Sequence, residues 1–392
     1  MDCILMTKEI MMRVQTYLKE HGIEKLQEEF SIIVTDYPDR VILNYNQIDS
    51  PRFNPICDEC RALILRKPDY SVLARSFDRF YNVGEGEAWK IFPISEARVD
   101  EKLDGSLISV YWDGEDWCVS TRKRAYAEGT TVWGQTFREL FDSAKDAEKL
   151  WDFLKNTFTL PNCTWIFELT SPENRIVTRY EETNISLIGV RDNESGDEWD
   201  GKQLDSIAQE MGVKRPRPYK FYTMDETIAA AKSLEIMEEG FVLVVETPQG
   251  SHARLKCKNE KFVAIAHMRE NGQISPRRVL TLVMANEHLE YLGYFPEDKH
   301  YFDFVEKVYR EATDRIALLR DEHLGIEDQK EFALTIIPKT VYSFEKGVLF
   351  RCKKGENMRD ILNNLGAKRL AKSLDLRKQF IKNFKIILAE ED

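Results

Sequence analysis

The hydrophobic periodicity of the sequence changes near residue 267, and this change constrains the fold more than any other feature. On the N-terminal side, strand-like runs bounded by turn residues occupy residues 31–35, 41–45, 62–65, 107–112, 117–121, 163–168, 185–190, 241–245 and 254–258. Helical spacing accompanies them over residues 1–29 (Ile10, Val14, Leu18 and Leu26), 136–158 and parts of 207–236. The pattern predicts antiparallel β-sheets with flanking helices.

On the C-terminal side, helical spacing replaces the strand signals. One apolar face of a long helix is marked by Phe302, Val305, Tyr309, Ala312, Ile316 and Leu319. A chain of 392 residues is also too long for one ordinary domain. We therefore predict an α+β protein with a sheet-rich domain over residues 1–267 and an all-helical C-terminal domain over residues 268–392.

The charge and the cysteines restrict the classes of partner. A formal net charge of −11 argues against a surface coated in cations, so any site for a polyanion must be local. The 7 cysteines have no framework spacing, which predicts a reducing cytoplasm. No second pair completes Cys57-x-x-Cys60 as a zinc site, and the apolar run 241–245 is far too short to span a membrane.

The segment from Glu101 to Ser106 places Lys102 beside an Asp-Gly turn, in which Gly105 is expected to take positive φ. A lysine amine is a nucleophile only when it has lost its proton. We expect the cations at residues 122–124, on the predicted partner strand, to lower the pKa of Lys102. Taken alone, the motif is more typical of a surface lysine that flanks a hairpin than of a nucleophile.

Three later segments favour a catalytic role for Lys102. Glu168 ends a hydrophobic strand, Glu239 precedes another, and Lys256 and Lys258 alternate with apolar residues on one strand. Each segment alone is common in turns and on wet sheet faces. Together and in this order, they suit nucleotidyl transfer through a lysine adduct, in which lysines neutralise phosphate charge and carboxylates bind ribose hydroxyls and position Mg²⁺.

This order resembles the covalent nucleotidyltransferase superfamily and, at closer range, the phage RNA ligase 1 family. The matching motifs are Lys102 to Ser106, Phe167-Glu168 with 172–177, Leu187 to Arg191, Glu239-Gly240 and Lys256 to Lys258. Upstream, the segments around Arg61 and Arg79 resemble the elements that grip the ATP phosphates in that family. The resemblance covers nearly the whole chain.

The resemblance implies a role for each matching residue. Lys102 would be the nucleophile, Glu168 would bind the ribose, and Glu239 would position the metal or a lysine. The residues at the ATP site would be Tyr45, Arg61, Arg79, Phe80, Gly105, Arg122, Glu168, Lys256 and Lys258. Arg79 and Arg122 stand where lysine is expected, and residues 185–190 lack the aromatic that stacks on the base in many relatives, so the group that covers adenine stays open, as do the ligands of Mg²⁺.

The implied activity is that of an ATP-dependent RNA ligase that joins 5′-phosphate and 3′-hydroxyl RNA ends, including those of nicked tRNA, through lysyl-AMP and adenylylated RNA. We expect a monomer in the cytoplasm, or in the host cytoplasm if the source is viral. The cations Arg377, Lys378, Lys382 and Lys385 of the last predicted helix are candidates for RNA contact, although this region would also suit a purely stabilising role.

Two alternatives remain open: a non-catalytic RNA-binding protein that keeps this fold, and a DNA ligase or capping enzyme. The helical C-terminal region argues against the second, because those enzymes append a small β-barrel. The chain also has no Gly-x-x-x-x-Gly-Lys-[Ser/Thr] motif, which argues against a P-loop enzyme.

Overall fold

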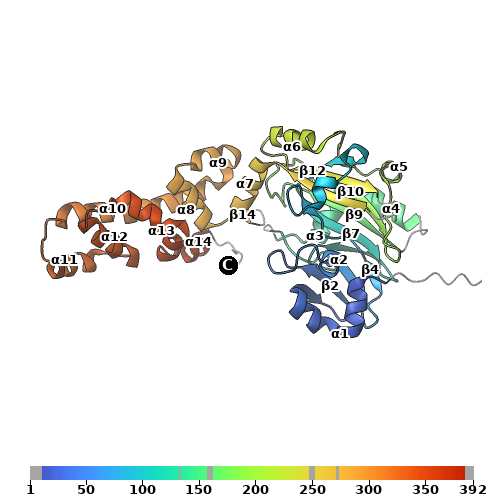
Figure 1. Ribbon diagram of the computed structural model, residues 1–392, viewed down its shortest axis with the longest axis horizontal. Coiled ribbons are helices and arrows are strands. Elements are labelled where there is room, and N and C mark those ends of the chain that lie inside the picture. Colours follow the sequence, from blue (N-terminus) through green and yellow to red (C-terminus); the bar gives the residue numbers. More distant parts are fainter. Residues whose placement is uncertain (1–10, 132–133, 157–161, 247–251, 271–272, 385–392) are drawn as a thin grey trace, which may run out of the picture. The chain divides into compact units, whose positions relative to one another are not determined.

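The computed structural model describes residues 11–131, 134–156, 162–246, 252–270 and 273–384. The chain divides into two compact units, Met1–Ile265 and Ala266–Asp392, drawn from blue to yellow and from yellow to red in Figure 1. The α+β class, with antiparallel sheets followed by a helical region, is confirmed. Among the described residues, no helix has the length and apolar character that crossing a membrane requires.

The first sheet of unit 1 has the order β1-β2-β3-β4, with antiparallel neighbours. Its strands are β1 (Ile32–Asp36), β2 (Arg40–Tyr45), β3 (Arg61–Arg66) and β4 (Val72–Ala74). The helices α1 (Arg13–Phe30) and α2 (Pro55–Glu59) pack against it, and Val14, Leu18 and Leu26 of α1 are buried in the shared core, as their spacing predicts. Ile10 of the predicted helix lies outside the described residues.

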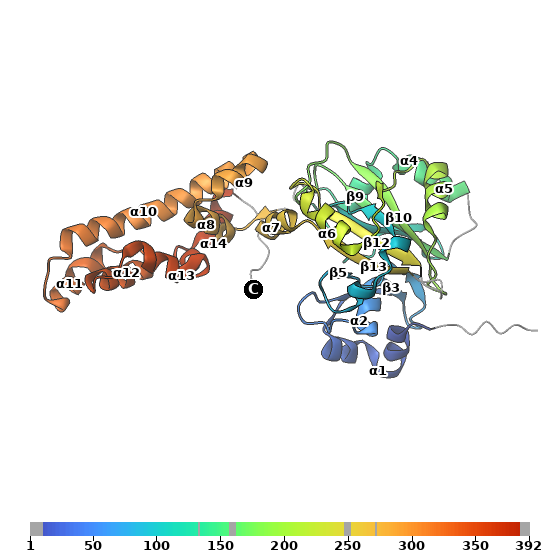
Figure 2. The same cartoon turned by 45° about the horizontal axis from the view of Figure 1, so that its top comes forward.

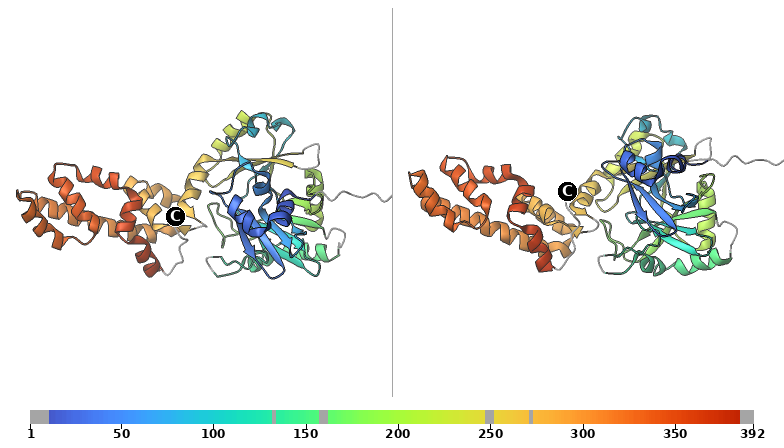
Figure 3. Two further views of the ribbon diagram at one scale, coloured as in Figure 1. Left: turned by 60° about the horizontal axis from the view of Figure 1, so that its bottom comes forward. Right: turned by 90° about the horizontal axis from the view of Figure 1, so that it is seen from below.

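The second sheet has the order β10-β9-β7-β8. Its strands are β7 (Ser106–Trp112), β8 (Trp117–Thr121), β9 (Cys163–Thr170) and β10 (Asn184–Asp192). The helices beside it in Figures 1 and 3 are α4 (Ala147–Asn156) and α5 (Gly201–Met211), and these share its core with α3 (Phe137–Asp142). The helical run predicted over 136–158 is two helices, because α3 ends at Asp142 with Ser143 as its C-cap, and α4 begins at Ala147. Phe158 lies outside the described residues.

The third sheet has the order β11-β6-β12-β13-β5, and only its β13–β5 pair is parallel among the pairings described. Its strands are β5 (Tyr81–Asn82), β6 (Arg98–Glu101), β11 (Pro218–Tyr219), β12 (Gly240–Glu246) and β13 (His252–Lys258). The core beneath it is formed with α6 (Met224–Ser233). Unit 1 also contains the short helices η1 (Ala88–Ile91) and η2 (Ile94–Glu96). The helix α7 (Glu260–Met268) begins in unit 1 and ends in unit 2.

The chain leaves the third sheet at the end of β6 and enters the second sheet at β7, so the Lys102 turn connects two sheets. It is not the flank of a hairpin. The nearest hairpin is the β7–β8 pair that follows, which forms around Asp113-Gly114 as predicted.

Unit 2 is helical except for the two-residue strands β14 (Arg269–Glu270) and β15 (Gln273–Ile274). Its helices are α8 (Pro276–Ala285), α9 (His288–Tyr294), η3 (Pro296–Asp298), α10 (Lys299–His323), α11 (Gln329–Ile336), η4 (Ile337–Lys339), α12 (Ser343–Lys353), α13 (Met358–Ser373) and α14 (Leu376–Phe384). Figure 2 shows the long helix α10 running beside α12. It buries Phe302, Val305, Ala312, Ile316 and Leu319 as predicted, whereas Tyr309 is only partly buried.

The last helix, α14, buries Phe380 and exposes Lys378 and Lys382, whereas Arg377 is partly buried. Lys385, the fourth of the predicted cations, lies outside the described residues.

Candidate active site

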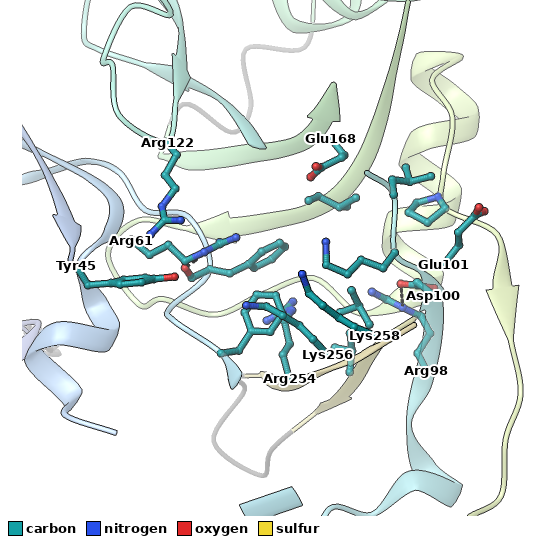
Figure 4. Close-up of a pocket in the computed structure, with 18 residues that line it drawn as sticks. Tyr45, Arg61, Arg98, Asp100, Glu101, Arg122, Glu168, Arg254, Lys256 and Lys258 are labelled. Carbon is teal, nitrogen blue, oxygen red and sulfur yellow. Dashed lines mark hydrogen bonds and ion pairs between the residues drawn. The ribbon is translucent and has the colours of Figure 1, made fainter. Parts of the chain in front are cut away.

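A cavity of about 190 Å³ opens in unit 1, where side chains from all three sheets converge. It is lined by Tyr45, Arg61, Phe77, Phe80, Arg98, Asp100, Glu101, Lys102, Leu103, Arg122, Glu168, Ile188, Pro216, Val242, Val244, Arg254, Lys256 and Lys258. Figure 4 shows Arg122, Arg61, Lys256 and Lys258 reaching toward one space that Glu168 also faces. Cations therefore outnumber carboxylates around it, as a site for a polyphosphate requires.

The turn that carries Lys102 is fixed by backbone and side-chain hydrogen bonds. The Lys102 N–H donates to the carbonyl of Gly240 at 2.8 Å. The Asp104 carboxylate accepts from the N–H groups of Val177 and Thr178 at 2.8 and 2.7 Å. Residues 73 and 74 positions downstream of Asp104 thus hold the turn. A preorganised nucleophile gains rate because the entropy of orienting it has already been lost.

Glycine is required at position 105 because neighbouring atoms leave no room for a side chain, and not because of its φ. It does not adopt a positive φ, contrary to the expectation from the Asp-Gly sequence. A Cβ atom at this position would lie 2.4 Å from the carbonyl oxygen of Leu169 and 3.1 Å from Cγ of Glu168. Gly105 therefore shapes the site although it does not line the cavity.

Two lysines of the cavity wall, Lys102 and Lys258, share one buried carboxylate. Nζ of Lys102 lies 2.7 Å from Oε2 of Glu239, and Nζ of Lys258 lies 2.8 Å from Oε1. The Glu239 side chain is only 7% exposed. Burial opposes the charged form of Lys102, but the charges of Glu239 and Glu168 outweigh it and raise the pKa of Lys102. The prediction that neighbouring cations lower the pKa of Lys102 is therefore wrong.

The lysine whose pKa is depressed is Lys256. Burial, reinforced by the charges of Arg61, Lys102 and Lys258, lowers the pKa of Lys256 to about 6. Its ammonium nitrogen lies 4.4 Å from the centroid of the Phe80 ring. Burial likewise lowers the pKa of the Arg61 guanidinium to about 10, which leaves that group charged at neutral pH.

Glu168 is the carboxylate that faces these cations from β9. Burial raises the pKa of Glu168 to about 7, against the opposing effect of Lys102. A carboxyl group that titrates near neutral pH and points into a cavity is a common feature of functional sites.

Arg79 occupies a different place from that expected of a phosphate ligand. Its guanidinium carbon lies 4.2 Å from the centroid of the Tyr45 ring, and that of Arg122 lies 4.5 Å from the same ring. Tyr45 and Arg122 line the cavity, whereas Arg79 is buried behind them. The structure thus places eight predicted residues on the cavity wall: Tyr45, Arg61, Phe80, Lys102, Arg122, Glu168, Lys256 and Lys258.

Four charged residues of the wall were missed as site residues, namely Arg98, Asp100, Glu101 and Arg254. Arg98 and Asp100 precede Lys102 on β6 and form an ion pair at 2.8 Å, and Arg254 is paired with the buried Glu198. A sequence signal was present for Arg98, Asp100 and Arg254, because these lie at period-two spacing from Lys102 or Lys256. Glu101, directly before Lys102, has no such signal.

Ile188 also reaches the cavity, because a register shift between Leu187 and Gly189 bulges β10 at this point. A bulge of this kind leaves no sequence pattern.

Magnesium is compatible with this wall through its carboxylates. The described residues contain no group of three or more His, Cys, Asp or Glu side chains placed to hold a metal. Mg²⁺ commonly binds through one or two carboxylates together with substrate phosphates, and Asp100, Glu101 and Glu168 are the carboxylates on the cavity wall.

Comparison with known proteins bears on what this site does. A family model described as RNA ligase matches residues 59–262, just over half of the chain. A protein of Autographa californica nuclear polyhedrosis virus, named for polynucleotide kinase and RNA ligase functions, is 33% identical over 74% of this chain and 42% of its own length. An RNA ligase of Rhodothermus phage RM378 is 28% identical over 66% of this chain and 70% of its own length. The chain thus spans less than half of the first relative.

Among solved structures, an archaeal ATP-dependent RNA ligase is similar with a TM-score of 0.44 and 12% identity, over 83% of this chain and 90% of that one. A Naegleria gruberi RNA ligase is similar with a TM-score of 0.40 and 15% identity, over 49% and 57% of the two chains. The family match covers the segment that holds Lys102, Glu168, Glu239, Lys256 and Lys258. The predicted resemblance is confirmed, and the chain belongs to the phage RNA ligase 1 family.

Proposed function

We propose that this protein is an ATP-dependent RNA ligase that uses Lys102 as a covalent nucleophile. Family membership supports the class of reaction. The observation that carries the mechanism is the shared contact of Lys102 and Lys258 with the buried Glu239. Both lysines line a cavity that is also lined by Arg61, Lys256 and Glu168. This arrangement supplies a nucleophile, cations for a polyphosphate and a carboxylate in one place.

In the first step, Nζ of Lys102 bonds to the α-phosphorus of ATP, and pyrophosphate leaves with the electrons of the bond it had to that phosphorus. The reacting amine must be neutral, and the nearest carboxylate to its proton is Glu239, at 2.7 Å. Arg61, Lys256 and Lys258 hold phosphate oxygens, and Glu168 accepts hydrogen bonds from the ribose. Mg²⁺, bound with the phosphates, would supply further neutralisation of their charge.

In the second step, the 5′-phosphate of RNA attacks the adenylyl phosphorus and releases Lys102. In the third, the 3′-hydroxyl of the other end attacks the activated 5′-phosphorus, and AMP leaves. The product is a phosphodiester bond. We further propose that broken RNA, including nicked tRNA, is the substrate, and that the helical unit contributes to its recognition.

The test is incubation with α-labelled ATP and Mg²⁺, followed by a denaturing gel. The parent protein should become labelled, and Lys102→Ala and Lys102→Arg should not, because a guanidinium keeps its proton in proteins. Lys123→Ala is the matched control, since Lys123 is an exposed cation in the neighbouring loop and does not line the cavity. An unlabelled parent that still binds RNA would favour a non-catalytic RNA-binding protein. Labelling of Lys102→Arg would show that Lys102 is not the nucleophile.

A further inference from the structure

A continuous row of stacked aromatic and guanidinium groups leads from the cavity wall to the protein surface. It begins with Arg122 and Tyr45, which line the cavity. Arg79 follows, with its guanidinium carbon 4.2 Å from the Tyr45 ring centroid and 5.3 Å from that of Tyr81. The row ends at Phe53, whose ring is stacked on Tyr81 with centroids 4.1 Å apart and an interplanar angle of 29°.

Tyr45 and Arg79 of this row are buried, whereas its outer member, Phe53, is open to solvent. Tyr45 is 5% exposed and Phe53 is 50% exposed. Among the described residues, the aromatic ring that stacks on Phe53 is that of Tyr81. Half of the large apolar Phe53 side chain is left in water. Leaving apolar area in water forfeits burial energy, so the position of this ring is not explained by the packing of the fold.

The Phe53 ring is nevertheless held in place from several sides. Its backbone has a φ of 57°, which is uncommon for a bulky residue. Its N–H donates to the Tyr81 hydroxyl at 2.6 Å, and that hydroxyl donates to Asp58 at 2.6 Å. Gly86 approaches the ring so closely that a Cβ there would lie 2.6 Å from its tip. A rigid, strained and exposed ring of this kind is typical of a binding surface.

We propose that Phe53 is a stacking platform for a nucleobase of the RNA substrate; this rests on the proposed function. Single-stranded RNA is held by cations along its phosphates and by aromatic rings under its bases. The cavity supplies the cations, and Phe53 supplies the ring at the end of a row that starts on the cavity wall. Phe53 does not line the cavity itself, which separates it from the site assigned to ATP.

The platform can be tested by the equilibrium affinity of the full-length protein for a fluorescent, 5′-phosphorylated single-stranded RNA. Phe53→Ala should weaken binding roughly ten- to a hundredfold, the usual effect of removing one base–aromatic stack. Phe53→Trp should restore the affinity. Tyr222→Ala is the matched control, because Tyr222 is a 66% exposed aromatic of the same unit, and it should leave RNA binding unchanged.

A second measurement separates stacking from a structural role. The test uses a series of RNAs, each with one abasic position. At one position, removal of the base should weaken binding to the parent protein but should not weaken binding to Phe53→Ala, which already lacks the stack. Labelling by ATP should be unchanged in Phe53→Ala, because Phe53 does not line the cavity. An equal loss of affinity on every RNA in the series, or unchanged RNA affinity in Phe53→Ala, would overturn the proposal. Since binding is measured without ligation, a parent that fails to label with ATP would instead count against the proposed function.

Discussion

Nζ of Lys102 and Oε2 of Glu239 lie 2.7 Å apart although the two residues are 137 positions apart in the chain. The pairing of β6 with β12 creates this contact. Phe241 on β12 lies opposite Glu101 on β6 in an antiparallel pair. Lys102, which follows β6, and Glu239, which precedes β12, therefore lie at the same end of the third sheet. The nucleophile and its counterion are therefore held by strand register.

Glu239→Gln should lower the rate of lysyl-AMP formation by about a hundredfold, because a misplaced reacting group typically costs that much. The carboxylate charge raises the pKa of Lys102, so its removal should also move the pH dependence of the residual labelling rate to lower pH. Rates measured over a pH series would show both effects. Glu238→Gln is the control, since Glu238 pairs with Arg217 outside the site and should change neither quantity.

Gly105→Ala should destabilise the protein by about 1–3 kcal/mol, the usual cost of overpacking, and reduce labelling by ATP. Its Cβ would lie 2.4 Å from the Leu169 carbonyl, so the turn or β9 must move, and Glu168 lies directly beside it. Urea unfolding and the labelling assay measure the two effects. Gly129→Ala is the matched substitution, because its Cβ would meet its nearest neighbour at 3.7 Å; equal behaviour of the two variants would contradict the close-approach argument.

Binding of ATP at pH 7.5 should take up a proton at Lys256. With a pKa of about 6, Lys256 is mostly neutral at this pH in the nucleotide-free protein. Phosphates favour the charged form and raise the pKa, so the proton enters as ATP binds. Calorimetry in two buffers that differ in ionisation enthalpy would measure the uptake. It should fall in Lys256→Met and persist in Lys90→Met, since Lys90 is exposed and ion-paired with Glu87; identical uptake in all three proteins would place the titrating group elsewhere.

The same pKa has a consequence for stability. Between about pH 6 and the ordinary pKa of lysine, the unfolded chain binds a proton at Lys256 that the folded protein does not. Lys256 therefore lowers the free energy of unfolding most near pH 6, and this destabilisation becomes smaller as the pH rises through the window.

A fragment covering residues 1–267 should still form lysyl-AMP, because every residue assigned to the chemistry lies in unit 1. Sealing of a nicked stem-loop should fall more than sealing of a short single strand. Loss of cations from unit 2, such as Lys378 and Lys382, should also flatten the salt dependence of RNA binding by roughly 0.7 in log–log slope per lost contact. Sealing rates at several salt concentrations would show this. Equal losses on both RNAs, or none on either, would favour a purely stabilising helical unit.

The sequence by itself determined the local structure and the chemical groups of this protein. Alternation along residues 254–258 predicted that Lys256 and Lys258 share a face, and both line the cavity. The change of periodicity near residue 267 predicted a sheet-rich region followed by a helical one. Such features follow from neighbours a few positions apart, whose period fixes which face a side chain takes.

Only the tertiary structure decided how these groups act on one another. The pairing of Lys102 with Glu239 raises a pKa that the nearby cations were expected to lower, while the depressed pKa belongs to Lys256. Arg79 packs on Tyr45 behind the cavity wall, and a bulge in β10 turns Ile188 into the cavity. Electrostatic shifts and packing depend on distances between segments far apart in the chain, and those distances are set by strand register and by how the sheets pack, which no local pattern encodes.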